Sequence, residues 1–369
     1  MQVKKDQSSF NTSELRPTSN SKTKVFVALS GGVDSAVSAA LLKEQGYDVT
    51  GVYMKNWSGD DFGIQADCPW DEDQTDAASV CKHLGIPFRS FNFERHYREK
   101  VVEYFFDEYS KGRTPNPDVM CNKEIKFKLF LNKAISEGAD LIATGHYAQV
   151  KKEGETYKLL AGKDNNKNQV YFLYSITQDQ LSKTLFPVGH LEKSEVRKLA
   201  DKFGLPNKNK PDSQGICFIG EIDVLKFLMA NIPKKHGKIV DIETNQEVGE
   251  HEGIYFYTIG QRAKIPNQTQ AYYFCAKDLD LNIMYVCHGE NNNELLKSVV
   301  EVEDWHWIGN PPSKVELSGV IRYRQKTQSG KIDIKNKKFI FDKPQRAVAS
   351  GQSLVIFEGT ECLGGGIIV

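Results

Sequence analysis

The sequence predicts an α/β protein with a doubly wound parallel sheet, followed by a small β-rich central domain and a C-terminal β-barrel. Three features of the 369 residues indicate this fold class. Strand-like and helix-like segments alternate from about residue 24 to residue 160, which is typical of a parallel sheet covered by helices. From about Lys238 onward, short apolar strands are separated by Gly and Asn turns, as in small sheets and barrels. A glycine-rich turn joins the first predicted strand to the first predicted helix.

The first region begins with the apolar, β-branched run 25–29, which indicates a buried parallel strand. The apolar positions of 36–42 then predict a helix that stops at Gly46. Ligands of doubly wound sheets bind beyond the carboxyl ends of the strands. Ser30, Met54 and the turn 144–146 should therefore meet at one edge. The remaining expected elements are strands at 48–54, 87–93 and 140–144, helices at 71–84, 94–109 and 124–137, and a helical segment at 177–204 with a break at 187–190.

In the second half, the runs 271–277 and 283–287 predict two strands joined by a turn, and further strands are expected at 315–323, 331–335 and 353–357. The first residues are rich in Ser, Thr, Asn and Lys and lack an apolar core, which predicts a disordered tail. We expect four parts: the tail 1–22, a catalytic domain 23–220, a central β-rich domain 221–298, and a barrel that contacts nucleic acid, 299–369.

The composition bounds the possible functions. With 40% hydrophobic and 26% charged residues, the chain is typical of a soluble globular protein. No membrane span or secretory signal is apparent, so we expect a cytoplasmic protein without a membrane partner. The formal net charge is zero, with 48 basic and 48 acidic residues, so a nucleic-acid surface would need local segregation of charge. None of the seven cysteines forms a Cys-x-x-Cys pair, which predicts free buried thiols and neither zinc nor structural disulfides.

The most informative stretch is Ser30-Gly31-Gly32-Val33-Asp34-Ser35, between the first strand and the first helix. Such a turn lets backbone N–H groups and the helix dipole approach phosphates. No lysine follows the glycines, as a Walker A loop requires, and the third glycine of a dinucleotide fingerprint is missing. A tight turn without a ligand would not need serine at both ends and an aspartate between them. The loop therefore predicts a nucleotide site of another kind.

A second stretch, Thr114 to Phe127, contains two prolines and an Asn that indicate a rigid loop before a helix. Asp118 and Cys121 are three positions apart and would share one face of that helix. A thiol at a helix start near Lys123 and Lys126 should have a depressed pKa and act as a nucleophile. The alternative is that Cys121 is a small buried residue.

A third stretch, Lys210 to Gly220, places Cys217 between Gly215 and Gly220. The glycines favour a flexible, exposed turn with a reactive thiol. Ile216 and Phe218 equally favour a buried strand cysteine. The spacing alone does not decide between these two interpretations.

Taken together, these motifs resemble those of the tRNA-specific 2-thiouridylases. These bacterial and mitochondrial enzymes belong to the ATP pyrophosphatase (PP-loop) superfamily and make 2-thiouridine at the wobble position of tRNA. The loop is shared across that superfamily, whereas the two cysteine motifs are specific to the family. The resemblance rests on Ser30-Gly-Gly-Val-Asp-Ser35, Tyr53-Met-Lys-Asn-Trp57, Asn116-Pro-Asp-Val-Met-Cys-Asn-Lys-Glu-Ile-Lys-Phe127, Ala143-Thr-Gly-His-Tyr147, Gln169-Val-Tyr-Phe-Leu173 and Gly215-Ile-Cys-Phe-Ile-Gly220.

The resemblance implies a mechanism. ATP, with its Mg2+, adenylates the C2 oxygen of uridine, and a persulfide sulfur then displaces AMP. Cys217 matches the persulfide carrier, Cys121 the partner nucleophile that resolves the chain as a disulfide, and Asp118 an acid beside the target base. A uridine flipped into a pocket is what chemistry on a base requires. A persulfide donor or relay protein is an implied partner besides tRNA, and no metal site of the protein's own is expected.

The resemblance also implies two sets of binding residues. Asn168 stands where relatives commonly have Asp. The stretch 322–324 combines cations with an aromatic residue, as expected of a strand that binds the RNA backbone, although a solvated strand face would look the same. The implied ATP contacts are Ala28, Leu29, Ser30, Gly31, Gly32, Val33, Asp34, Ser35, Met54 and Gly145. The implied tRNA contacts are Asn116, Pro117, Asp118, His146, Lys167, Asn168, Gln169, Arg322, Tyr323 and Gln352.

Two other functions are compatible with the loop. One is an amide-forming synthetase that adenylates its substrate and uses ammonia, but that chemistry needs no pair of reactive thiols. The other is a non-catalytic protein that binds tRNA or a nucleotide, which would not need Asp34, Asp118 and both cysteines. Cys121 and Cys217 are 96 positions apart. We therefore expect the segment around Cys217 to move on tRNA binding in order to bring the two thiols within reach.

Overall fold

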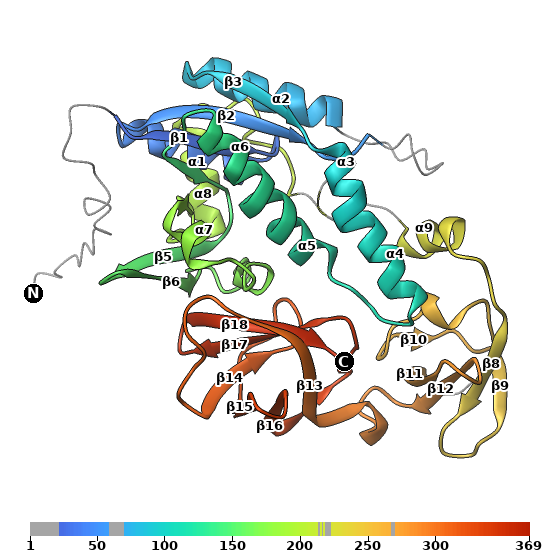
Figure 1. Cartoon of the computed structure of the whole chain (residues 1–369). Helices are drawn as coiled ribbons and strands as arrows, with labels where there is room; N and C mark the ends of the chain where they lie inside the picture. Colours follow the sequence, from blue (N-terminus) through green and yellow to red (C-terminus); the bar gives the residue numbers. More distant parts are fainter. Residues whose placement is uncertain (1–21, 59–69, 213–214, 216, 218–222, 267–269) are drawn as a thin grey trace, which may run out of the picture.

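The computed structural model describes most of the chain, namely residues 22–58, 70–212, 215, 217, 223–266 and 270–369. Within these residues the strands form a five-stranded parallel sheet, a five-stranded mixed sheet and an eight-stranded antiparallel sheet that contains a closed barrel (Figure 1). The predicted fold class is confirmed. Residues 1–21 of the predicted tail, and Cys68, lie outside the described residues. No helix in the described part is long and apolar enough to cross a membrane.

The parallel sheet has the order β3-β2-β1-β4-β7, with β1 at its centre. Successive side chains of β1 point to opposite faces, so Val25 and Val27 pack in one core and Phe26 and Ala28 in another. The strands are β1 (Lys24–Leu29), β2 (Asp48–Lys55), β3 (Phe88–Asn92), β4 (Leu141–Ala143) and β7 (Thr184–Leu185).

Helices cover both faces of this sheet, as the hydrophobic pattern of β1 requires. One core is closed by α1 (Val33–Glu44), α2 (Trp70–Leu84) and α8 (Lys193–Lys202). The other is closed by α3 (Glu94–Tyr97), η3 (Arg98–Val102), α4 (Glu103–Ser110), α5 (Pro117–Met120), η4 (Cys121–Phe130) and α6 (Leu131–Ser136). In both runs, 94–110 and 117–136, a π-helical segment lies between α-helical ones.

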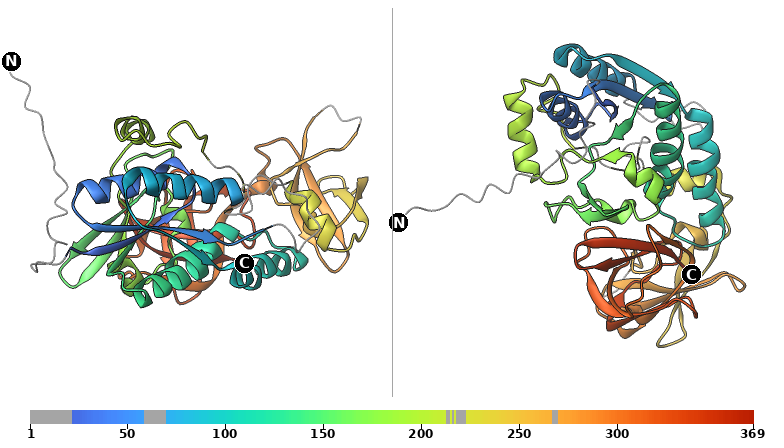
Figure 2. Two further views of the ribbon diagram at one scale, coloured as in Figure 1. Left: turned by 90° about the horizontal axis from the view of Figure 1, so that it is seen from above. Right: turned by 60° about the vertical axis from the view of Figure 1, so that its left-hand side comes forward.

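Two parts of this region differ from the prediction. The segment 177–204 is not one broken helix, because the short strand β7 lies between α7 (Gln178–Ser182) and α8. A hairpin of β5 (Ala148–Glu153) and β6 (Thr156–Ala161) was not predicted, and β6 pairs with β18 near the end of the chain. The 3-10 turn η5 (Val170–Phe172) follows the hairpin. The hairpin lies between the parallel sheet and the barrel (Figure 2).

The middle sheet has the order β10-β11-β12-β8-β9 and is antiparallel except where β12 runs parallel to β8. The predicted strand pair 271–287 is confirmed as β11 and β12, whose turn-proximal pair is Asp278 opposite Ile283. The helix α9 (Val224–Asn231) precedes the sheet. Its elements are β8 (Gly237–Asp241), β9 (Glu247–His251), η6 (Ile254–Phe256), β10 (Arg262–Ala263), β11 (Tyr272–Asp278) and β12 (Ile283–His288).

The C-terminal strands close into a six-stranded antiparallel barrel, because β13 pairs with both β16 and β18. The predicted strand 315–323 is too long: β14 ends at Val320, and the chain then turns, with the Gln325 N–H donating to the Arg322 carbonyl oxygen at 3.3 Å. The turn η7 (Asn293–Leu295) leads into the barrel strands β13 (Leu296–Trp307), β14 (Glu316–Val320), β15 (Gln328–Asp333), β16 (Lys338–Arg346), β17 (Ser353–Glu358) and β18 (Glu361–Ile368).

Candidate active site

The glycine-rich loop lies between β1 and the first turn of α1. Gly31 has a φ of +79°, a left-handed conformation that favours glycine. The Ser35 hydroxyl accepts a hydrogen bond from the Ser30 N–H at 3.2 Å and donates one to the Gly32 carbonyl oxygen at 3.0 Å. The side-chain amide of Asn207 donates to the Gly31 carbonyl oxygen at 2.7 Å. These contacts fix a tight turn at the N-terminus of α1.

The turn after β4 packs directly against this loop. In β1 and β4, Val27 lies opposite Ala143, so the two strands end side by side. A Cβ atom on Gly145 would lie 2.7 Å from the Ser35 nitrogen and 2.9 Å from the Asp34 carbonyl carbon. Only glycine fits such a close approach of two backbones. Met54, at the end of the neighbouring strand β2, is buried. The prediction that the three strand ends meet at one edge is confirmed.

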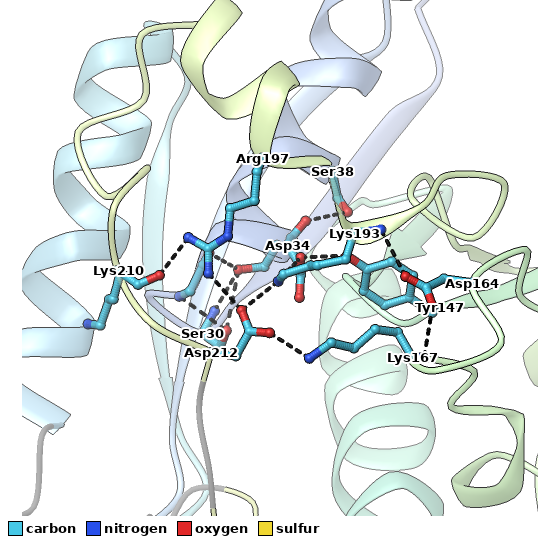
Figure 3. Close-up of polar contacts among 12 residues, drawn as sticks. Ser30, Asp34, Ser38, Tyr147, Asp164, Lys167, Lys193, Arg197, Lys210 and Asp212 are labelled. Carbon is cyan, nitrogen blue, oxygen red and sulfur yellow. Dashed lines mark hydrogen bonds and ion pairs between the residues drawn. The ribbon is translucent and has the colours of Figure 1, made fainter. Parts of the chain in front are cut away.

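Asp34 is held by two donors that the sequence analysis did not identify (Figure 3). The Tyr147 hydroxyl donates to Asp34 Oδ1 at 2.9 Å, and Lys193 Nζ donates to the same oxygen at 2.7 Å. Burial and the negative charge of Asp34 raise the pKa of the Tyr147 phenol well above its ordinary value. Tyr147 therefore stays protonated and remains a hydrogen-bond donor to this carboxylate.

Asp212 forms ion pairs with three cationic side chains beside the glycine-rich loop. Its carboxylate pairs with Lys193 at 2.7 Å, Arg197 at 2.8 Å and Lys167 at 2.5 Å. Burial disfavours the charged carboxylate, but the hydrogen bonds from Lys167 and Lys193 outweigh it and hold the pKa of Asp212 well below its ordinary value. No sequence motif indicates this network, because its members come from distant segments that the fold brings together.

The two predicted thiols lie together in a second cluster. Asn116 caps α5 by accepting the Val119 N–H at 3.3 Å, which places Asp118 and Cys121 on the same side of the helix start. The Cys121 thiol donates to Cys217 Sγ at a sulfur–sulfur distance of 3.8 Å. Asp118 Oδ1 accepts the backbone N–H of Cys217 at 3.0 Å. The expectation that a rearrangement is needed to bring the thiols within reach is therefore wrong.

The predicted depression of the Cys121 pKa is also wrong. Cys121 is fully buried, and burial together with the neighbouring Cys217 raises its pKa well above the ordinary value. The thiol with the lowered pKa is Cys217, because it accepts the hydrogen bond from Cys121 and lies beside the Lys126 ammonium. Lys123 is exposed on the same segment. Sequence reasoning found the cations but could not tell which thiol faces them.

His146 links the two clusters, because it follows Gly145 and precedes Tyr147. It is buried between Phe127 and Phe186 and lies 3.5 Å from Lys126 Nζ through Nε2. Burial, and secondarily the charge of Lys126, lower the His146 pKa well below its ordinary value, so the imidazole is neutral. Since an ammonium only donates, Nε2 is the acceptor, and Nδ1 carries the proton that it shares with Thr144 Oγ1 at 2.7 Å.

The residues expected to contact tRNA lie in different surroundings. The Asn168 side-chain oxygen accepts the N–H groups of Gly162 at 3.3 Å and Val170 at 3.2 Å. The Gln169 side-chain oxygen accepts the Tyr147 N–H at 3.0 Å. These two amides hold the loop in place from within. Lys167, the third member of the run, pairs with Asp212.

On the barrel side, Arg322 is exposed and donates to the Arg346 carbonyl oxygen at 3.0 Å. The Tyr323 ring packs on Phe172, with centroids 4.6 Å apart. Gln352 donates to the carbonyl oxygens of Thr114 at 2.8 Å and Pro115 at 3.3 Å. The barrel thus touches the loop that leads to Asn116, Pro117 and Asp118.

A parallel α/β sheet whose first strand runs into a Ser-Gly-Gly loop at a helix N-terminus defines a nucleotide-binding domain of the HUP class. Residues 23–221 match the family model described as tRNA methyl transferase HUP domain, and this match implies ATP binding. Residues 225–288 match the tRNA methyl transferase PRC-barrel domain, and residues 297–368 match the aminomethyltransferase beta-barrel domain.

Full-length relatives narrow the assignment. The chain is 47% identical over 363 residues to the tRNA-specific 2-thiouridylase MnmA of Streptococcus mutans, covering 95% of this chain and 96% of the relative. It is 48% identical, with the same coverage, to that of Streptococcus pyogenes serotype M4. A solved 4-thiouridine synthetase in complex with RNA and ATP has 19% identity and a TM-score of 0.35, and covers 54% of this chain and 46% of its own. The chain belongs to the tRNA-specific 2-thiouridylase family, whose members are sulfurtransferases.

Proposed function

We propose that this protein transfers sulfur to C2 of the wobble uridine of tRNA, using ATP to activate the C2 oxygen. The observation that carries the proposal is the pair Cys121 and Cys217 at 3.8 Å, with the Asp118 carboxylate beside them. His146 and Gly145 connect this pair to the glycine-rich loop within two residues. Methyl transfer, which the family model's description names, would need neither an adenylating loop nor two adjacent thiols.

In the first step, the C2 oxygen of uridine attacks the α-phosphorus of ATP, and pyrophosphate leaves. We assign Asp118 the role of accepting the proton that the uridine ring loses. Burial raises the pKa of Asp118, which makes its carboxylate a better proton acceptor than an exposed one. Asn116 and Pro117 would shape the pocket for the base from the helix start that they form.

In the second step, the terminal sulfur of a Cys217 persulfide anion attacks C2, and AMP leaves with the oxygen. This forms a bond between the transferred sulfur and C2. The Cys121 thiolate then attacks Cys217 Sγ, and the electron pair of the broken S–S bond goes to the sulfur on C2. The products are 2-thiouridine and a Cys121–Cys217 disulfide, which a thiol reductant returns to two thiols.

The loop suits a triphosphate. Its N–H groups lie at the N-terminus of α1, and Lys193, Arg197 and Lys167 provide three positive charges next to it. In the proposed complex, Ala28 to Ser35 would hold the phosphates, and Met54 and Gly145 the adenosine. Mg2+ would arrive with ATP and be held by the phosphates and Asp34, where it would neutralise phosphate charge.

We propose that the segment 23–220 performs the chemistry on tRNA. The barrel, 299–369, contributes Arg322 and Tyr323 to the surface that contacts tRNA, and the domain 221–298 sets the distance between the catalytic domain and the barrel. Lys167, Asn168, Gln169, His146 and Gln352 remain proposed contacts. A separate persulfide donor would charge Cys217. The reaction is proposed to occur in the cytoplasm, where the thiols remain reduced; the described cysteines are all free.

Nucleoside mass spectrometry tests the proposal. Unmodified tRNA is incubated with the protein, ATP, Mg2+ and a persulfide donor such as cysteine persulfide, using wild type, Cys121→Ser and Cys217→Ser in parallel. We expect 2-thiouridine with wild type and none with either variant. Cleavage of ATP to AMP by wild type without sulfur in the tRNA would refute the proposal and favour an amide-forming synthetase instead.

A further inference from the structure

The side chain of Lys126 extends from η4 toward the two thiols, although it belongs to a helix whose other side chains mostly pack in the core. It is partly buried and hydrogen bonds Cys217 Sγ, while Nε2 of the neutral His146 lies 3.5 Å from its Nζ. The titratable groups around it come from several elements. Cys121 and Asp118 lie on its own helical run, Cys217 on the segment after α8, and His146 after β4. Tyr97 on α3 interacts with Cys121, Cys217 and Asp118.

A half-buried ammonium in such surroundings needs an anion to balance its charge. His146 is neutral and offers only a lone pair. Asp118 is an acceptor for the Cys217 backbone N–H. Burial opposes the charge on Lys126, yet the nearby Cys217, Cys121 and Asp118 raise its pKa, so the lysine stays protonated. Among these three groups, Cys217 is the one that accepts a hydrogen bond from the Lys126 ammonium.

We propose that Lys126 is a catalytic residue of this site, whose ammonium stabilises the anionic sulfur of Cys217, first as thiolate and then as persulfide, and afterwards that of Cys121. The inference deepens the proposed sulfur transfer and rests on it. The order follows from charge. While the thiolate or persulfide at Cys217 is anionic, it accepts a hydrogen bond from the Cys121 S–H group and keeps Cys121 protonated.

Once the persulfide has attacked C2, the Cys217 sulfur is no longer anionic. The negative charge at Cys217 raises the pKa of Cys121, whereas the positive charge of Lys126 lowers it. When the charge at Cys217 is lost, only that of Lys126 remains, so the pKa of Cys121 falls. The Cys121 proton leaves to water, because Asp118 already holds the proton taken from uridine, and the thiolate attacks Cys217 Sγ. A single lysine thus makes Cys217 the first nucleophile and Cys121 the second, which prevents Cys121 from attacking a persulfide before the sulfur has been transferred.

The test uses the full-length reduced protein without tRNA or ATP. Alkylation by iodoacetamide is followed against pH, and carboxamidomethyl-Cys217 is quantified by peptide mass spectrometry. For Lys126→Met, we expect the half-maximal pH to rise by at least one unit, equivalent to roughly tenfold slower alkylation near pH 7. Lys126→Arg should keep most of the wild-type profile. Lys123→Met, three positions away and exposed, is the matched control and should leave it unchanged.

A Lys126→Met profile that superimposes on the wild type would overturn the proposal. If that variant does not fold, as judged by circular dichroism, Lys126→Gln takes its place. A second comparison tests the order of the two thiols: Cys121 should be alkylated faster in Cys217→Ser than in wild type, and this gain should vanish in Cys217→Ser/Lys126→Met. Equal Cys121 rates in all three proteins would contradict it. Because no step needs tRNA, failure here and failure of sulfur transfer are distinguishable.

Discussion

Gln352 in the barrel donates its side-chain amide to the carbonyl oxygen of Thr114, 238 positions earlier in the chain, at 2.8 Å. The Thr114 N–H in turn donates to the Ser350 carbonyl oxygen at 2.8 Å. A Cβ atom on Gly351 would lie 2.8 Å from the Thr114 nitrogen, so the two backbones are in close contact. The barrel therefore clamps the residue that precedes Pro115 and Asn116, where the helix bearing Asp118 and Cys121 starts.

Replacing Gln352 with alanine should slow sulfur transfer by loosening this clamp. The loss of a side-chain hydrogen bond of this kind costs about 1 kcal/mol of stability. We expect kcat to fall several-fold, and the loss of the proposed tRNA contact should add a smaller rise in the KM for tRNA. Gln149→Ala, which removes a similar bond to the Ala161 carbonyl oxygen, is the control and should leave kcat unchanged. A raised KM with an unchanged kcat would show that Gln352 acts only through its tRNA contact and that its bond to Thr114 does not support the site.

Gly145→Ala should abolish nucleotide binding. The new methyl group would overlap the backbone of Asp34 and Ser35, and neither backbone can yield without moving the loop. Isothermal titration with ATP and Mg2+ measures the effect. Gly249→Ala is a suitable control, because its Cβ atom would meet only Ile239 at 3.8 Å. Normal ATP affinity in Gly145→Ala would show that the loop is not the nucleotide site.

Arg322→Ala should weaken tRNA binding without affecting ATP cleavage. The Arg322 side chain is exposed. The logarithm of the tRNA-binding constant falls linearly with the logarithm of the salt concentration, and removing one cation that pairs with an RNA phosphate makes this slope shallower by roughly one. Filter binding at several salt concentrations measures this slope. Lys314→Ala removes another exposed barrel cation, one paired with Glu358, and should leave the slope unchanged. Identical slopes for Arg322→Ala and wild type would remove Arg322 from the interface.

Asp212→Asn should destabilise the fold in a pH-dependent way. The folded-state pKa of Asp212 lies below its ordinary value of 3.8, so its contribution is complete above that value and is lost as the pH falls through the folded pKa. At pH 7 we expect a loss of about 2 kcal/mol, because three cations lose their partner at a partly buried site. Urea unfolding should show this difference shrinking below about pH 4.

The control for Asp212 is Asp201→Asn, since Asp201 pairs with Lys208 on the open surface, with 66% of its side chain exposed. Surface pairs contribute about 0–1 kcal/mol, so little change is expected at any pH. A loss for Asp212→Asn that stays constant from pH 7 to pH 3 would mean that its charge is not what stabilises the network.

Local patterns predicted β1, β2, β3 and β4 of the parallel sheet and missed the fifth strand, β7. The alternation of strand and helix segments from β1 to β4 and the Ser-Gly-Gly turn can be recognised in short stretches of sequence, and both are present in the structure. The β5–β6 hairpin was missed because its outer partner, β18, lies at the other end of the chain. The strand at 315–323 was predicted too long because the turn after Val320 is held by Gln325, whose side chain accepts the Ile321 N–H at 2.8 Å, and no turn residue in 321–323 signals it.

Part of the candidate site was predictable, because some of its residues belong to short sequence motifs. Cys121, Cys217 and Asp118 were identified by motif, and the structure brings them together. Their protonation was not predictable, because it depends on which thiol is enclosed and which faces Lys126. The network of Lys193, Arg197 and Asp212 was missed since no spacing in the sequence relates these residues to Asp34.

The most direct measurement is a single turnover with protein that carries a persulfide on Cys217. The protein is mixed with unmodified tRNA, ATP and Mg2+ in the absence of reductant. Peptide mass spectrometry then counts Cys121–Cys217 disulfides, and nucleoside analysis counts 2-thiouridines. The account predicts one disulfide for each 2-thiouridine formed. Full yield of 2-thiouridine with both cysteines recovered as thiols would contradict it.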